Sequence, residues 1–344
     1  MEVQNLEKVQ SWLQQNTFHC HDYQDLESLY HNKKGRTISL VMPTLNEEEH
    51  VGTIIETIFR DLNKDFQLID EFVVIDGGST DKTFDIVSKL SIEYKLLTLV
   101  KECDILPKYQ SKKGKGNQLW KGLYCSKGTI VLYCDSDLKN FDVRMLYGLI
   151  GPLLTTPVKF IKGFYERPLV ISDTIQKSNE GGRVTELCAR PMLNLLYPEL
   201  GGFVQPLGGE YGGYRDILEN VEYMTGYGVE VNMLIDILEK FGLKKMGQVD
   251  LLKREHRHQN TNALSKMSFI IMNTILRRNM KKQMSSKLLM KNFTQVVDSN
   301  FKNNVTSNTQ IGEHFKLIDN AHDEPLPPLN ELKQRTFEYA MNAL

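Results

Sequence analysis

The chain has 344 residues, of which 41% are hydrophobic and 25% charged, with a formal net charge of -1 at pH 7. These values are ordinary for a folded globular protein and give no general argument for binding nucleic acid or an anionic membrane. Residues 1–16 lack the basic and apolar parts of a leader, and no uncharged run reaches the roughly 18 residues of a membrane helix, so we expect a cytoplasmic protein. Five cysteines without CxxC spacing predict neither a disulfide framework nor a zinc site.

Short runs rich in β-branched residues alternate with segments of helical period from residue 37 onward. The expected strands are 37–43, 71–76, 96–100 and 129–135, and the expected helices are 47–62, 80–91 and 115–126. Such alternation, with right-handed crossovers, gives a mostly parallel sheet covered by helices on both faces. The sequence therefore predicts an α/β fold that binds its ligand at the carboxyl ends of the strands.

Polar segments follow three of these strands: PTLNEEE after the first, DGGSTD after the second and DSD at the end of the fourth. The carboxylates of Asp135 and Asp137 in DSD repel each other unless a divalent cation lies beside them. A DxD taken alone is more simply a cap for the following turn, and DGGSTD taken alone is typical of a turn before a helix. Convergence of all three segments on one edge favours a binding site.

The segments MPTLNEEEHVG, VVIDGGSTDKT and VLYCDSD, in this order and spacing, resemble the nucleotide-sugar-binding half of GT-A glycosyltransferases, which have a Rossmann-like fold. The resemblance covers residues 37–165. It implies that Asp137 binds a divalent cation, Mg²⁺ or Mn²⁺, on the donor diphosphate. The residues it implies for the nucleotide sugar at the strand ends are Pro43, Thr44, Leu45, Asn46, Glu47, Asp76, Gly77, Asp135, Ser136 and Asp137. A GxGxxG fingerprint is absent from the first strand-helix turn, which argues against a dehydrogenase.

Two further segments carry basic residues beside glycines. In KKGKGNQLWKG (112–122), Lys115 lies at an expected helix start, where the family pattern places positive charge near the nucleotide; a solvated lysine-rich loop is the simpler alternative. In EGGRVTEL (180–187), Gly182, Arg183 and Thr185 combine helix-start N–H groups, a guanidinium and a hydroxyl, which suit a phosphate or carboxylate. A plain turn with a surface arginine is the alternative here.

Together with QPLGGEYGGYR, TGYGVEVNMLID and LLKREHRHQN, the second of these segments resembles the glucosyl-3-phosphoglycerate synthase family over residues 37–275. The resemblance implies transfer of glucose from UDP-glucose, or alternatively GDP-glucose, to 3-phosphoglycerate with retention of configuration, by a homodimer. It places Tyr227 and Glu230 at the hexose and His256 beside Asp137 as a metal ligand. It assigns acceptor binding to Gly182, Arg183, Thr185 and His258, and catalysis to Glu230, Asp137 and Arg183.

The chain departs from the family pattern at His258, where asparagine is common, and at Gly77, where serine is frequent. For retention we favour attack on the same face as the departing phosphate, with Glu230 orienting glucose, over double displacement through a glycosyl-enzyme. Two alternatives stay open at this point. One is another GT-A enzyme, such as a mannosyl-3-phosphoglycerate synthase or a polyprenyl-phosphate glycosyltransferase. The other is a non-catalytic sugar-nucleotide-binding protein.

Four parts of the chain are expected. Residues 1–36 form a helical extension, 37–165 the nucleotide-sugar-binding half, 166–275 the acceptor-binding half of the same catalytic domain, and 276–344 a helical extension that the resemblance assigns to dimerisation. The polar segment 165–183 is interpreted either as a mobile lid between the two halves or as a passive connection.

Overall fold

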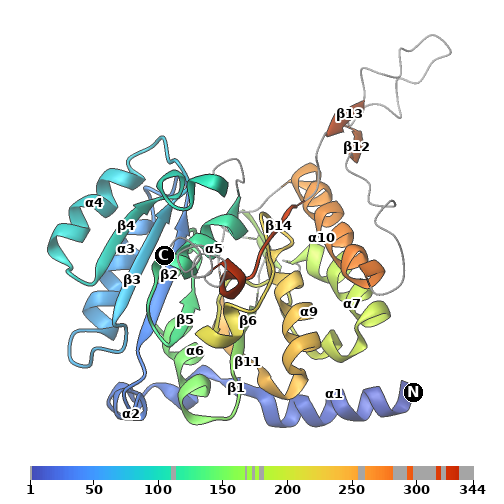
Figure 1. The fold of residues 1–344 in the computed structure, drawn as a ribbon, viewed down its shortest axis with the longest axis horizontal. Coiled ribbons are helices and arrows are strands. Elements are labelled where there is room, and N and C mark those ends of the chain that lie inside the picture. The colour runs from blue at the N-terminus through green and yellow to red at the C-terminus, as the bar shows by residue number, and fades with distance from the viewer. Residues whose placement is uncertain are drawn as a thin grey trace, which may run out of the picture.

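The computed structural model describes residues 2–109, 114–166, 169–172, 175–177, 182–254, 260–281, 293–296, 315–318 and 323–332. At its centre lies one eight-stranded sheet with the strand order β1-β11-β6-β9-β5-β2-β3-β4 (Figure 1). Its strands are β1 Thr17–His19, β2 Ile38–Thr44, β3 Glu71–Asp76, β4 Leu97–Lys101, β5 Ile130–Tyr133, β6 Phe160–Glu166, β9 Tyr211–Tyr214 and β11 Met246–Lys253. Within this sheet β9 is antiparallel to both neighbours and every other pair is parallel. The predicted mostly parallel sheet is confirmed.

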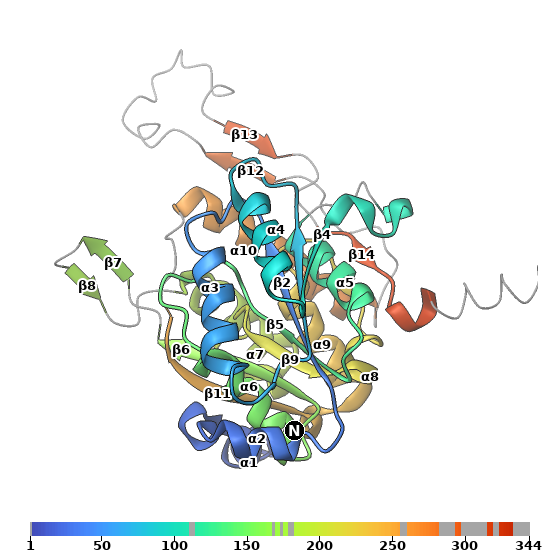
Figure 2. The same ribbon diagram turned by 90° about the vertical axis from the view of Figure 1, so that its left-hand side faces the viewer.

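Helices cover both faces of the sheet (Figure 2). They are α1 Glu2–Asn16, α2 Leu26–Asn32, α3 Val51–Thr57, α4 Thr83–Glu93, α5 Lys115–Cys125, α6 Arg144–Thr155, α7 Arg190–Leu196, α8 Arg215–Leu218, α9 Val229–Phe241 and α10 Thr261–Lys281. Alternate residues of the buried strand β2 face opposite sides: Leu40 packs in the core under α3, α4 and α6, whereas Val41 packs in the core under α5 and α9. This burial on both faces explains the continuous apolar run of the sequence.

Shorter elements connect these helices and strands. Helix α3 continues into the π-helical turn Ile58–Leu62, and a second π-helical turn, Thr185–Ala189, precedes α7. The 3-10 turns are Cys20–Tyr23, Glu102–Asp104, Pro107–Tyr109, Pro198–Gly202 and Leu243–Lys245. The predicted helix 47–62 begins only at Val51. The preceding residues belong to a loop in which Asn46 and Glu47 are hydrogen-bonded to Ser79 and Thr83, after β3.

The terminal regions contain strands as well as helices. Strand β1, which lies between α1 and α2 in the sequence, pairs in parallel with β11 and forms one edge of the sheet. After α10, β12 Phe293–Val296 pairs with β13 Phe315–Ile318, and β14 Pro325–Leu326 pairs with β10 Tyr223–Met224. The expected helical extension after residue 275 thus includes three strands in its described part. Pairs as short as these carry no periodic signal in a sequence.

Within segment 165–183 the described backbone forms the hairpin of β7 Leu169–Ser172 and β8 Ile175–Lys177. Whether this segment acts as a lid or as a connection stays a prediction. No helix that the described residues form combines the length and the apolarity that crossing a bilayer demands.

Candidate active site

The three polar strand ends meet at one edge of the sheet. Strands β2 and β3 are in parallel register, with Thr44 beside Asp76, and β5 flanks β2 on its other side. The hydroxyl of Ser136 donates to the carbonyl of Pro43 at 2.8 Å, which fixes the DSD turn against the end of β2. The convergence expected from the sequence is therefore present in the fold.

Asn46 and Glu47 hold the first two loops together. The amide oxygen of Asn46 accepts from the backbone N–H of Thr80 at 2.8 Å, and its own N–H donates to the hydroxyl of Ser79 at 3.0 Å. The N–H of Glu47 donates to the hydroxyl of Thr83 at 2.8 Å. Asn46 has a φ of 57°, a left-handed conformation that asparagine tolerates better than most residues. These two residues thus connect the loop after β2 to the loop after β3 by hydrogen bonds. The neighbouring Leu45 is exposed.

A pocket of about 490 Å³ opens between the Asp76 loop and the end of β4. This volume lies within the ordinary range for small-molecule sites. The carboxylate of Asp76 accepts from the backbone N–H groups of Gly78 at 3.1 Å and Ser79 at 3.2 Å, which fixes its orientation at the pocket wall. Lys101 and Lys121 also line the pocket, and the sequence reasoning missed both, because nothing local marks a lysine of β4 or α5 as facing β3.

Gly77 lies in this wall where a side chain has little room. A Cβ atom at this position would lie 1.9 Å from Nε2 of Gln118. The amide of Gln118 therefore occupies the space that a serine would need, and the serine frequent in the family would require that flexible amide to move.

Lys115 joins two carboxylates at the start of α5. Its Nζ atom lies 2.6 Å from Oδ1 of Asp135 and 3.0 Å from Oε1 of Glu230, which is in the first turn of α9. Burial alone would lower the pKa of Lys115, but the two carboxylates outweigh it and hold that pKa above its ordinary value. The ammonium group is therefore a fixed positive charge between the DSD turn and α9.

Arg254, at the end of β11, neutralises the same turn from the other side. Its guanidinium lies 2.8 Å from Oδ2 of Asp135, 3.1 Å from Oδ1 of Asp137 and 3.1 Å from Oε2 of Glu210. It also donates to the hydroxyl of Tyr165 at 2.7 Å. Burial alone would raise the pKa of Asp135, yet Lys115 and Arg254 hold that pKa well below its usual range. We call these six residues the charge cluster: Lys115, Asp135, Asp137, Glu210, Glu230 and Arg254.

Arg254 and Glu210 are functional candidates that the sequence reasoning missed. Arg254 belongs to the segment LLKREHRHQN, in which the family resemblance marks only the histidines. Glu210 is fully buried, and burial raises the pKa of its carboxyl against the opposing effect of Arg254. A charged residue at the end of an apolar strand was the available signal, since buried charges are usually paired.

The turn that contains Gly208 and Gly209 packs against the charge cluster. A Cβ at Gly209 would lie 2.0 Å from Oδ2 of Asp135, so only glycine permits this approach. The buried Lys162 of β6 donates to the carbonyl of Gly208 at 2.6 Å and lies over the ring of Tyr211 at 4.5 Å. Burial lowers the pKa of Lys162 to about 8. Lys162 thus ties the turn, and through it Asp135, to the sheet.

The segment expected to bind the acceptor begins a helical turn. Gly182 has a φ of 76°, which favours glycine, and its carbonyl accepts from the N–H of Glu186 at 3.1 Å. Thr185 is buried and Arg183 is half-buried. On the donor side, Tyr227 is exposed in the loop before α9.

The proposed metal ligands are only partly within the described residues. His256 and His258 lie in 255–259, outside the described residues, so their roles stay predictions. Among the residues that the structure describes, no group of three acidic, histidine or cysteine side chains forms a metal site. Asp137, whose side chain is 37% exposed beside the buried cluster, offers a carboxylate of the kind that Mg²⁺ and Mn²⁺ prefer.

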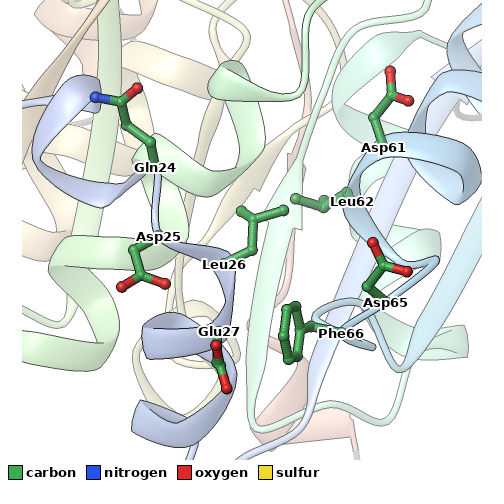
Figure 3. A pocket seen from close by; sticks show the side chains of 8 residues that line it. All are labelled: Gln24, Asp25, Leu26, Glu27, Asp61, Leu62, Asp65 and Phe66. Carbon is green, nitrogen blue, oxygen red and sulfur yellow. The ribbon is translucent and has the colours of Figure 1, made fainter.

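A second pocket, of about 290 Å³, lies between α2 and the residues that precede β3 (Figure 3). Four of its eight lining residues carry carboxylates and none carries a basic group: Gln24, Asp25, Leu26, Glu27, Asp61, Leu62, Asp65 and Phe66. Such a lining repels phosphate groups, and the segments involved enter the amino ends of β2 and β3. The strand-end pocket and the charge cluster are therefore the candidate site.

Known proteins are similar to this chain in sequence. The family model described as glycosyl transferase family 2 matches residues 39–193. The chain is 43% identical over 265 residues to glucosyl-3-phosphoglycerate synthase of Petrotoga mobilis, an alignment that covers 76% of this chain and 80% of that protein.

Two solved structures are similar over nearly the whole chain. One is glucosyl-3-phosphoglycerate synthase from Mycobacterium tuberculosis in complex with Mn²⁺, UDP-glucose and phosphoglyceric acid, with a TM-score of 0.74, 33% identity and coverage of 92% of this chain and 98% of that one. The other is mannosyl-3-phosphoglycerate synthase from Rubrobacter xylanophilus, with a TM-score of 0.79, 33% identity and coverage of 93% and 98%. The predicted GT-A architecture is confirmed by both.

Proposed function

The chain belongs to the glucosyl-3-phosphoglycerate synthase family of hexosyltransferases, and we propose that it transfers glucose from UDP-glucose to 3-phosphoglycerate with retention of configuration at the sugar carbon. The observation that carries the proposal is the charge cluster around the DSD turn. It places two basic side chains around Asp135 and leaves one face of Asp137 exposed. GDP-glucose is the alternative donor.

The donor site that we propose has two ends. The nucleoside occupies the pocket beside Asp76, whose lining carries Lys101 and Lys121 together with four carboxylates. The hexose lies near Tyr227 and Glu230. The relative crystallised with Mn²⁺ and UDP-glucose supports a divalent cation between these ends. Asp137, with His256, would hold the ion, which when bound stabilises the negative charge that develops on the departing diphosphate.

The residues of the chain do the remaining work by orientation and charge. Lys115 supplies a fixed positive charge beside Asp135 and Glu230, close to where we place the departing phosphate. An ammonium at 3.0 Å also weakens Glu230 as a nucleophile, because the pair stabilises its carboxylate. This pairing favours an orienting role for Glu230 and same-face attack by the acceptor hydroxyl, whose proton passes to the departing phosphate.

Replacing Glu230 with glutamine should lower turnover by about a hundredfold, because the charged bond to Lys115 and its hold on glucose are both weakened. Intact-protein mass spectrometry of the wild type during turnover should show no glycosyl-enzyme. Detection of a glucosyl adduct on Glu230 would establish double displacement instead. The control is Glu331→Gln, which removes an exposed carboxylate outside the charge cluster and should behave as wild type.

Replacing Arg183 with alanine should raise the KM for 3-phosphoglycerate by about tenfold to a hundredfold, because a charged hydrogen bond to the acceptor is lost. The KM for UDP-glucose should stay within about twofold, since the donor pocket lies on other elements. Arg183→Lys should recover part of the effect, because it keeps the charge but not the planar fork. Equal changes in both KM values would remove Arg183 from the acceptor site.

The proposal is tested by the release of UDP from UDP-glucose with and without 3-phosphoglycerate. Acceptor-dependent release supports it, and equal release without acceptor contradicts it. Because the fold is shared with a mannosyl transferase, the fold does not choose the hexose, so GDP-glucose and GDP-mannose are assayed alongside. Preferred turnover of GDP-mannose would reassign the donor while leaving the acceptor in place.

A further inference from the structure

The loop before α9 is held by a segment almost one hundred residues further along the chain. Strand β14 pairs with β10, and Thr225 and Glu324 exchange two hydrogen bonds of 3.0 Å, from Thr225 N–H to the Glu324 carbonyl and from Glu324 N–H to the Thr225 hydroxyl. The indole of Trp120 donates to the carbonyl of Pro327 at 2.9 Å. Leu326 is fully buried. We call residues 323–327 the C-terminal strap.

Asp323 places a carboxylate directly against this loop. Its Oδ2 atom accepts from the N–H of Gly228 at 2.6 Å, at the start of a 13-residue helix whose first residue is Val229. A helix start favours a negative charge, and Gly228 itself supplies no side chain to cap the helix. Asp323 therefore caps α9 from a distance of 95 residues in sequence.

The two glycines of the GYG motif lie where a side chain has little room. A Cβ at Gly226 would lie 2.4 Å from Oδ1 of Asp323, and a Cβ at Gly228 would lie 3.0 Å from its Oδ2 and 2.3 Å from Oγ1 of Thr274. A side chain at Gly226 would displace Asp323, and one at Gly228 would first meet Thr274 of α10. Tyr227 lies between the two glycines, so the strap and α10 both constrain the backbone around Tyr227.

The other side of the loop rests on the start of α5. The N–H of Asn117 donates to the carbonyl of Thr225 at 3.1 Å, and a Cβ at Gly114 would lie 2.6 Å from the same carbonyl. Lys115, between these two residues, bonds Glu230 in the first turn of α9. The loop 225–228 is thus held between the Lys115 segment and Asp323.

We propose that Asp323 is a positioning residue for the sugar end of the donor site, holding loop 225–228 so that Tyr227 and Glu230 meet the hexose. The inference rests on the proposed function, because it takes these two residues to bind the donor. Asp323 itself accepts from the backbone N–H of Gly228, and it acts on the substrate only through the loop.

The charge of Asp323 is sensitive to pH in the range where the enzyme can be assayed. Burial raises the pKa of its carboxyl to about 6, against the opposing effect of the N–H groups of Gly228 and Gly226. The charged group that faces it is Glu230 of α9, which also raises that pKa. Above about pH 6 the carboxylate is ionised and the bond to Gly228 is charge-assisted; below it the bond is a neutral one.

The test compares Asp323→Asn and Asp323→Ala with the wild type, and uses Glu331→Gln as the control. We expect Asp323→Ala to raise the KM for UDP-glucose by about tenfold to a hundredfold at pH 7.5, with a smaller change in kcat, because the N–H of Gly228 loses its acceptor. Asp323→Asn keeps an acceptor and should raise that KM by only about threefold to tenfold. The ratio of the Asp323→Asn KM to the wild-type KM should fall toward one below pH 6.

A merely structural role would give another pattern. The inference is wrong if, in both variants, kcat falls and the KM values for both substrates change in proportion to a lower Tm, and if the ratio of the Asp323→Asn KM to the wild-type KM does not depend on pH. If the wild type does not turn over UDP-glucose at all, the proposed function fails separately, and hydrogen exchange then tests the contact itself. Residues 225–230 should exchange faster in Asp323→Ala than in the wild type, and unchanged exchange would overturn the positioning role.

Discussion

Replacing Asp137 with alanine should reduce turnover by about a thousandfold at saturating substrates. The loss has this size because the metal that we place on the donor diphosphate supplies several kcal/mol of charge stabilisation in the transition state, and about 1.4 kcal/mol is worth a factor of ten. Asp137 is the carboxylate of the cluster that combines a bond to Arg254 with an exposed side chain, so it can reach an ion. Titration with Mn²⁺ in the presence of UDP should show weaker binding in parallel.

Two further variants show whether a loss of turnover in Asp137→Ala comes from a lost metal ligand. Asp22→Ala removes an exposed carboxylate outside the cluster and should leave both turnover and Mn²⁺ binding unchanged. Asp137→Asn keeps the size and one oxygen, and should recover little, since neutral amides bind divalent cations less strongly than carboxylates. An Asp137→Ala enzyme with wild-type turnover and wild-type metal dependence would remove Asp137 from the metal site.

Replacing Arg254 with methionine should destabilise the protein by about 3–5 kcal/mol and abolish most activity, because removing one partner of a buried ion pair leaves uncompensated charge. The guanidinium contacts Asp135, Asp137 and Glu210, and the last of these is fully buried. Urea unfolding measures the stability. The effect should be largest where Glu210 is ionised and should begin to shrink as acid protonates Glu210, because burial raises the pKa of that carboxyl.

The partner substitution provides the control. Glu210→Gln in the Arg254→Met background should restore part of the lost stability, because the buried charge is then removed with its partner. Arg60→Met, which takes away an exposed arginine paired with Asp61, should leave stability and activity unchanged. Additive effects of Arg254→Met and Glu210→Gln would show that the two side chains are not coupled.

The structure gives a more specific reason than the sequence does for tolerating Asp135 and Asp137 at the end of a buried strand. The pattern predicted that a divalent cation relieves their repulsion. The structure adds two basic side chains that already do so for Asp135, Lys115 at 2.6 Å and Arg254 at 2.8 Å. Lys115 could be assigned from a family pattern, whereas Arg254 lies 119 residues from Asp135 and follows only from the packing of β11 beside β6.

The strands, helices and strand-end loops could be predicted because each is written in a short stretch of sequence, as apolar periodicity or as turn residues. The C-terminal strap could not, because β10 and β14 have two residues each and pair across about a hundred intervening positions. For the same reason, the glycines of GYG were interpreted as family markers. Their physical cause, the close approach of Asp323 to Gly226 and of Thr274 to Gly228, appears only in three dimensions.

The measurement that tests the proposed reaction most directly is NMR of the product formed from UDP-glucose and 3-phosphoglycerate, with Mg²⁺ or Mn²⁺ and with the metal removed by chelator. We predict a glucosyl phosphoglycerate with the α configuration, the same anomer as the donor, formed only when the metal is present. A β-linked product, or equal product formation after chelation, would contradict retention or the metal role of Asp137.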